Sequence, residues 1–200
     1  MDHLVEIGSG WGGFAIYAAQ HYGCKVTTIT ISQAQYEEAV ARIEAAGLSH
    51  RVDVQLKDYR LLKGKYDKLV SIEMIEAVGE QYLATYFNKC RELLKPNGLA
   101  LIQAITIEDA RYAKALNTVD YIKRYIFPGS FIPCISVMTQ SASEQKLRLK
   151  HLEDIGQSYA QTLHCWRQRF LEQRDQVLQL GFDERFIRMW DFYLCYCEGG

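Results

Sequence analysis

Short apolar runs alternate with amphipathic segments along the first half of the chain. Five runs are rich in aliphatic and β-branched residues, the pattern of buried parallel strands: 4–7, 24–29, 52–56, 66–72 and 99–106. Helical spacing covers residues 14–22, 32–46 and 80–94, with Ser32 as the expected N-cap and Gly47 as the expected C′ residue of the second helix. This alternation with short joints predicts a doubly wound, mostly parallel α/β sheet.

The pattern changes after the fifth predicted strand. Residues 107–148 hold two or three short helical pieces, interrupted by Phe127-Pro128-Gly129 and Ile132-Pro133, and are expected to form a helical insertion over the carboxyl edge of the sheet. A sixth strand is expected over 147–155, and helices over 159–180 and 183–197. Pro96-Asn97-Gly98 predicts a turn before the fifth strand. Because no repeat or linker divides the chain, we expect a single domain over 1–200.

Composition narrows the class of protein. The chain has 200 residues with 23 basic and 24 acidic side chains, a net charge of −1, which argues against a nucleic-acid binder. Its six cysteines form no CxxC pair, so we expect a reducing, cytoplasmic compartment, and neither the cysteines nor the five histidines have metal-site spacing. No signal peptide or apolar run of about 20 residues is present, so no transmembrane segment is expected. The sequence leaves a homodimer open.

A glycine loop follows the first strand and carries the first candidate chemistry. In Glu6-Ile-Gly-Ser-Gly-Trp-Gly-Gly13, glycines allow positive φ and a close ligand, and a helix opening at Trp11 would direct free N–H groups at it. A Rossmann site for NAD requires an acidic residue at the end of strand two, where this chain has Thr30. The phosphate-binding lysine that follows the glycines of a P-loop is missing here, which excludes that motif. The spacing Glu6-x-Gly8-x-Gly10 instead resembles the first motif of S-adenosylmethionine-dependent methyltransferases.

Later segments make the resemblance specific. They are Thr28–Gln35, Val70–Gly79, Leu101–Thr106, Tyr125–Gly129, His151–Tyr159, Thr162–Phe170 and Gly181–Trp190. In order and over the whole chain, they resemble the cyclopropane-fatty-acyl-phospholipid synthase family, which includes the mycolic acid cyclopropane synthases. The resemblance implies a class I, Rossmann-like S-adenosylmethionine-dependent methyltransferase fold, with the 107–148 insertion covering an acyl pocket. It implies these cofactor-binding residues: Glu6, Gly8, Gly10, Trp11, Gly12, Thr30, Ile31, Gln35, Asp58, Tyr59 and Ser71.

The reaction that the resemblance implies is methyl transfer from S-adenosylmethionine to the cis double bond of an unsaturated phospholipid acyl chain. Loss of a proton from the added methyl then closes a cyclopropane ring, and a bound bicarbonate takes that proton. The family's site maps onto Glu76, Ile105 and Tyr159, while Gln103 stands where many members have a histidine. The resemblance also predicts that the N-terminal lid segment, with its cysteine, and the last strand are missing, so that the chain is truncated at both ends.

Each candidate residue also has a purely structural interpretation. Glu76 suits a helix start, Tyr159 a core position, Gln103 a polar strand end, Asp58 a turn and Trp11 a packing role. Three alternatives to cyclopropanation stay open: a methyl-branched lipid product, an N-methylated product, or a non-catalytic cofactor-binding remnant.

A membrane partner is a separate hypothesis. Residues 111–150 contain seven basic and two acidic side chains, with aromatic residues among them. That mixture suits an anionic phospholipid surface, and equally a solvated rim above the pocket.

Overall fold

The computed structural model describes residues 1–199, which form two compact units. The sheet unit contains residues 1–119 and 129–149, and the helical unit contains residues 120–128 and the chain from Lys150 onward. The expectation of one methyltransferase domain over 1–200, with 107–148 as an acyl-pocket cover, stays a prediction.

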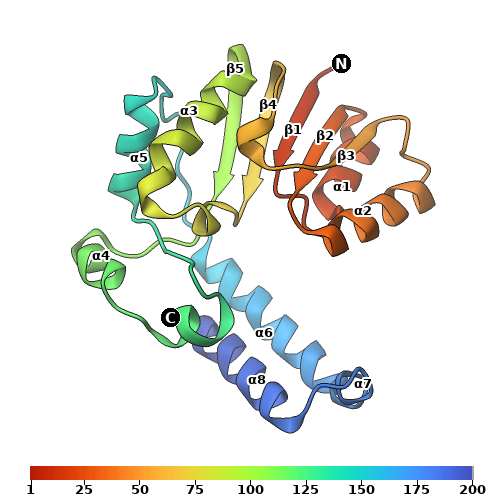
Figure 1. The fold of residues 1–200 in the computed structure, drawn as a ribbon, viewed down its shortest axis with the longest axis vertical. Coiled ribbons are helices and arrows are strands. Elements are labelled where there is room, and N and C mark those ends of the chain that lie inside the picture. Colours follow the sequence, from red (N-terminus) through yellow and green to blue (C-terminus); the bar gives the residue numbers. More distant parts are fainter. Residues whose placement is uncertain (200) are drawn as a thin grey trace. The chain divides into compact units, whose positions relative to one another are not determined.

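The sheet unit is built on five parallel strands: β1 (His3–Ile7), β2 (Lys25–Thr30), β3 (Val52–Leu56), β4 (Tyr66–Ile72) and β5 (Leu94–Gln103). Their order is β3-β2-β1-β4-β5, so the predicted parallel α/β sheet is confirmed (Figure 1). The strand order reverses between β1 and β4. In open α/β sheets ligands bind beside such a point, at the carboxyl ends of the strands.

Helices cover both faces of this sheet (Figure 1). On one face α1 (Gly13–Tyr22) and α2 (Gln33–Ala45) share a core with Val26 and Val70. On the other, α3 (Leu83–Leu93) and α5 (Ile135–Glu144) share a core with Leu69 and the fully buried Tyr86. Ser32 Oγ accepts the N–H of Gln35, which confirms the predicted N-cap of α2.

Three local expectations are corrected. The first helix begins at Gly13 rather than Trp11, because Gly12 takes a left-handed conformation with φ 81°. Pro96-Asn97-Gly98 lies inside β5 as a bulge, since the pairing jumps from Tyr66 with Leu94 to Lys68 with Leu99. Residues 147–155 form no strand. Their apolar alternation breaks at His151, and Asp154 then turns the chain by accepting the N–H of Gly156 at 2.8 Å.

The insertion contains three helical pieces, within the predicted number. They are α4 (Asp109–Leu116), the π-helical turn η4 (Ile122–Ile126) and α5. The turn η4 falls in the helical unit, whereas α4 and α5 belong to the sheet unit.

The helical unit pairs α6 (Gly156–Glu172) with α8 (Glu184–Glu198) through the short α7 (Arg174–Gln179). The helix expected over 159–180 is therefore interrupted at Gln173. Asp183 N-caps α8 by accepting the N–H of Phe186. The ring of Phe182, just before α8, stacks on that of Phe186, and Phe186 stacks on Trp190 along α8, with centroids 4.2 and 5.6 Å apart. Within residues 1–199, no helix combines the length and the apolar character that crossing a bilayer requires.

Candidate functional site

Three glycines of the loop after β1, Gly8, Gly10 and Gly12, have positive φ, but their surroundings differ. A Cβ on Gly8 would lie 3.2 Å from the side chain of Met74, and one on Gly12 would lie 3.2 Å from Ala39 Cβ. A Cβ on Gly10 would meet no atom within 4 Å. Gly8 and Gly12 are therefore required by close packing, whereas Gly10 borders open space at the carboxyl edge.

Glu6 and Thr30 fix the strand ends that flank this loop. Glu6 is only 2 % exposed, and Thr28 Oγ1 donates to its Oε2 at 2.6 Å. Burial raises the pKa of the Glu6 carboxyl to about 7. Thr30 Oγ1 donates to Gln35 Oε1 at 2.8 Å and accepts the N–H of Ser32 at 3.1 Å. These buried contacts tie β1 to β2 and β2 to the start of α2.

The remaining predicted cofactor residues fall into two groups. Trp11 and Ile31 are 54 % and 79 % exposed, which leaves their side chains available to a ligand. Asp58 and Ser71 already have partners: Asp58 pairs with Arg60 at 2.6 Å, which lowers the Asp58 pKa, and Ser71 Oγ donates to a backbone carbonyl of β1 at 3.2 Å.

Tyr59 lies next to Asp58, in the turn that follows β3. Its ring packs 5.7 Å from that of Tyr86, and burial raises its pKa. Open space above Gly10, exposed apolar side chains and the polar pair at Thr30 together fit a ligand such as S-adenosylmethionine, with a flat base and a polar amino-acid part.

Glu76 and Ile105 meet at the carboxyl ends of β4 and β5. Glu76 lies in the 3-10 turn η2 (Ile75–Ala77), and the N–H of Ile105 donates to its Oε1 at 2.6 Å. The other carboxylate oxygen, Oε2, is buried and has no hydrogen-bond partner among the described residues. Burial raises the pKa of the Glu76 carboxyl, the N–H of Ile105 opposes that rise, and the negative charge of Glu73 adds to it.

Gln103 is paired with Glu73, a residue that the sequence analysis missed. Gln103 Nε2 donates to Glu73 Oε1 at 2.8 Å, and the Glu73 N–H donates to the Gln103 carbonyl at 3.0 Å. Glu73 has a φ of 50°, a left-handed conformation that non-glycine residues rarely adopt. A second glutamate three residues before Glu76, at the end of a central strand, was the signal available in the sequence.

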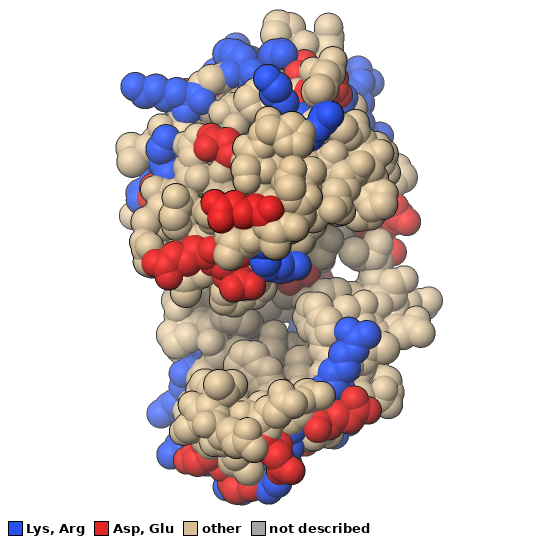
Figure 2. Space-filling model, turned by 90° about the vertical axis from the view of Figure 1, so that its right-hand side faces the viewer, with Lys and Arg blue, Asp and Glu red and all other residues tan. Residues whose placement is uncertain are grey.

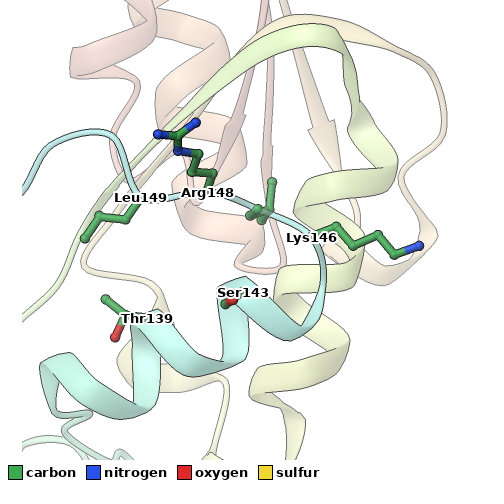
Figure 3. Close-up of a pocket in the computed structure, with 6 residues that line it drawn as sticks. Thr139, Ser143, Lys146, Arg148 and Leu149 are labelled. Atoms are coloured by element: carbon green, nitrogen blue, oxygen red, sulfur yellow. The ribbon is translucent and has the colours of Figure 1, made fainter.

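Tyr159 lies in the helical unit, on α6, where its ring packs edge-on against Trp166 with centroids 6.3 Å apart. Its membership of the site stays a prediction. A pocket of about 460 Å³ on the sheet unit contains none of the predicted site residues. It lies beside α5, and Lys146 and Arg148 extend in different directions from it (Figure 3). Their positive charges do not converge on a common ligand, so we assign this pocket no role.

Comparisons with known proteins agree with this geometry. The family described as mycolic acid cyclopropane synthetase matches residues 1–200. The chain is 42 % identical over 200 residues to tuberculostearic acid methyltransferase UfaA1 of Mycobacterium tuberculosis, covering 100 % of this chain and 47 % of that protein. It is 36 % identical over 196 residues to cyclopropane-fatty-acyl-phospholipid synthase of Escherichia coli K12, covering 98 % of this chain and 49 % of that protein.

A solved structure extends the likeness to three dimensions. The cyclopropane synthase MmaA2 of Mycobacterium tuberculosis superposes with a TM-score of 0.89 at 21 % identity, covering 99 % of this chain and 72 % of that one. At this identity the likeness shows the fold, which is that of class I methyltransferases. The chain spans about half the length of the curated relatives it matches. Because the family pattern matches from the first residue to the last, this chain belongs to the mycolic acid cyclopropane synthetase family.

Proposed function

We propose that this protein transfers a methyl group from S-adenosylmethionine to the cis double bond of an unsaturated phospholipid acyl chain. The observation that carries the proposal is the Glu76 carboxylate, which is held by the N–H of Ile105 and keeps a buried, unpartnered oxygen beside the switch point of the sheet. An unpaired buried carboxylate oxygen costs free energy, so its retention suits a site that a ligand completes.

The glycine loop is the proposed binding site of the methyl donor. When bound, S-adenosylmethionine supplies a methyl group carried on a positively charged sulfur. The backbone at Gly10 borders open space, and the exposed ring of Trp11 adds an apolar contact surface. Of the predicted cofactor residues, Ser71 and Asp58 have the weakest support, because other groups of the protein already engage their polar atoms.

Methyl addition to an alkene leaves a cation on the neighbouring carbon of the acyl chain. Glu73 and Glu76 place two carboxyl groups at the ends of β4 and β5, where their negative charge stabilises such a cation. Loss of a proton from the added carbon then forms a cyclopropane ring. This is the product proposed first.

A second product has specific support. UfaA1, the 42 % identical relative, is named a tuberculostearic acid methyltransferase. If the cation moves to the methylated carbon before the proton is lost, the added carbon stays as a branch and no ring forms. Gln103, which stands in place of the histidine common in the family, is a candidate for this difference.

Bicarbonate is the base that the family resemblance implies, and the donors around Glu76 fit it poorly. An anion requires N–H or O–H donors, and the Ile105 N–H is already engaged by Glu76. One amide hydrogen of Gln103 is engaged by Glu73. We therefore derive no step through bicarbonate.

The proposed partner is a membrane that contains unsaturated phospholipid. The basic residues that suggested it are dispersed in the structure: Arg111 and Lys114 lie on α4, Lys146 and Arg148 follow α5, and three others belong to the helical unit. An anionic membrane surface as partner stays a prediction.

Incubation of the chain with methyl-labelled S-adenosylmethionine and unsaturated phospholipid vesicles tests the proposal. Mass spectrometry of the released acyl chains should show the label in a cyclopropane, or in a branch for the second product. Glu76→Gln should lower turnover at least about 100-fold, the scale expected for removing a charged group from the reacting centre, and leave the dissociation constant of the methyl donor nearly unchanged.

Glu44→Gln is a suitable control, because Glu44 is exposed on α2 and away from β4 and β5. Label in an amine head group, or equal losses of turnover and donor affinity in Glu76→Gln, would contradict the proposal. Donor binding without transfer to any lipid would favour the non-catalytic alternative.

A further inference from the structure

We propose that the carboxylate of Glu73 is the proton acceptor of this reaction and that Gln103 holds it in position. This inference rests on the proposed methyl transfer and names a base that the chain itself supplies. Both products considered above release one proton from the added carbon, so the reaction requires such a group.

The hydrogen bonds around Glu73 fix its carboxylate at the carboxyl edge. Its backbone N–H donates to the Gln103 carbonyl at 3.0 Å, and the Gln103 side chain donates to its Oε1 at 2.8 Å. A left-handed φ of 50° at a residue with a side chain costs about 1 kcal/mol or more. Strain of this kind concentrates at functional sites. Two independent hydrogen bonds to one neighbouring residue hold Glu73 in that conformation.

Exposure separates the roles of the two glutamates. Glu76 is half-buried, and its Oε1 is already engaged by the N–H of Ile105. Glu73 is exposed, so a proton taken from the substrate passes from its carboxyl directly to water. A base must be regenerated in each cycle, and this difference favours Glu73 for that task.

The local charge also disfavours an external anion as the base. Glu73 and Glu76 lie three residues apart, and the Glu73 charge acts on the Glu76 carboxyl with the sign of repulsion. Figure 2 views the sheet unit from the side of β3 and α2 and shows further acidic side chains toward its lower edge, with a basic side chain among them. A bicarbonate ion would enter beside two carboxylates and compete with both for the same donors.

The chemical balance is simple. The methyl group forms a bond to one alkene carbon as its bond to sulfur breaks, and the other alkene carbon becomes a cation. For the cyclopropane, a C–H bond of the added carbon then breaks, its electron pair closes the ring, and the proton goes to Glu73. For the branched product, a hydrogen first moves with its electron pair from the methylated carbon to the cationic carbon. The same C–H bond then breaks, its electron pair forms a double bond between the added carbon and the methylated carbon, and the proton again goes to Glu73. No oxidant or reductant is consumed.

Two variants of the full chain test the inference. Glu73→Gln keeps the shape and can still accept from Gln103, and Glu73→Gly suits the positive φ. Each should lower formation of the proton-loss products at least about 100-fold in carbonate-free buffer, the usual scale for a general base. Methyl transfer itself should continue, with the cation captured by water as a methylated alcohol. A purely structural role for Glu73 would lower all products in the same proportion.

Bicarbonate dependence gives the second readout. Wild-type turnover should change by less than about twofold when bicarbonate is added, because its base is built in. In Glu73→Gly, added bicarbonate should restore part of the lost product, since one negative charge is gone and Gln103 is free to donate. Isotope-labelled bicarbonate should show NMR line broadening with Glu73→Gly and none with the wild type. This binding measurement does not depend on catalytic activity.

The outcomes separate the two proposals. Wild-type turnover that requires added bicarbonate, or line broadening with the wild-type protein, would overturn the role of Glu73 and leave the methyl transfer intact. No labelled lipid from the wild type would contradict the proposed function, and with it this inference. Glu108→Gln is the matched control, because Glu108 is an exposed carboxylate whose side chain forms no cap hydrogen bond on α4, and it should behave as the wild type.

Discussion

The sheet unit and the helical unit of this protein are stabilised in different ways. The sheet unit has two buried cores, one on each face, and its buried polar side chains at Glu6, Thr28 and Thr30 are joined by hydrogen bonds. Among the described residues of the helical unit, the buried apolar side chains are Leu163, Ile187 and Leu194. Its remaining contacts are stacked rings along α8 and partly exposed ion pairs such as Arg167 with Asp191.

This difference indicates which chemistry each unit can support. A carboxyl group whose pKa is raised by burial requires a water-poor setting, and among the described residues the two such groups, Glu6 and Glu76, both lie in the sheet unit. Partly exposed ion pairs are worth little, so the helical unit is stabilised mainly by apolar and aromatic contacts. The comparison predicts that the two units respond differently to the same kind of substitution.

The largest effect is expected from deleting a buried leucine in each unit. Leu69→Ala should lower the free energy of unfolding by about 4 kcal/mol, because β4 is packed on both faces and cannot collapse into the cavity. Leu163→Ala should cost about 2 kcal/mol, since half-exposed neighbours on α6 and α8 can close part of the space. Urea unfolding, monitored by hydrogen exchange in each unit, measures the loss of unfolding free energy in both variants. Loss of protection across both units in both variants would show that they are not distinct.

The next effect concerns the pH dependence of the sheet unit. The Glu6 pKa is raised to about 7 in the folded state, above its unfolded value, so the folded state binds the extra proton. Stability should therefore fall by about 3 kcal/mol as pH rises from about 4.5 to about 7, and level off above that. Glu6→Gln should remove this slope and gain stability relative to the wild type at pH 8. Urea unfolding at several pH values measures this dependence for both proteins. If stability depends on pH in Glu6→Gln as it does in the wild type, Glu6 is charged in the folded protein and is not the source of the slope.

The smallest effect separates two glycines of the same loop. Gly12→Ala should lower stability by about 2 kcal/mol, because it combines positive φ with a contact at Ala39. Gly10→Ala has the strain without the clash, and should cost about 1 kcal/mol of stability. Its main effect should be weaker binding of S-adenosylmethionine, measured by calorimetry. The reverse pattern would place the ligand near Gly12 instead.

The strands were predictable because their apolar residues cluster or, in β3, alternate, and β3 and β4 begin and end as expected. The segment 147–155 was not, because two alternating leucines suffice for a strand pattern while the acidic turn at Asp154 decides the local structure. The sequence predicted a turn at Pro96-Asn97-Gly98, where the structure has a bulge in β5. A turn and a bulge can both place an asparagine in the left-handed region, as Asn97 is here, so the residue types did not distinguish them.

The candidate site was only partly predictable. The family resemblance implied one site for Glu76 and Ile105, and in the structure the N–H of Ile105 donates to Glu76. Glu73 was missed because its importance depends on a hydrogen bond to Gln103, 30 residues away, and on an unusual φ that no local pattern indicates. The division into two units was also missed, because the chain crosses between them without a linker composition.

The close approach of Gly8 to Met74 limits how this protein can vary. The two positions are in close contact, so a side chain at position 8 requires the side chain at position 74 to shift or to be smaller. Met74 lies between Glu73 and Glu76, and a change in the glycine loop would therefore have to be matched within the segment that carries both acids.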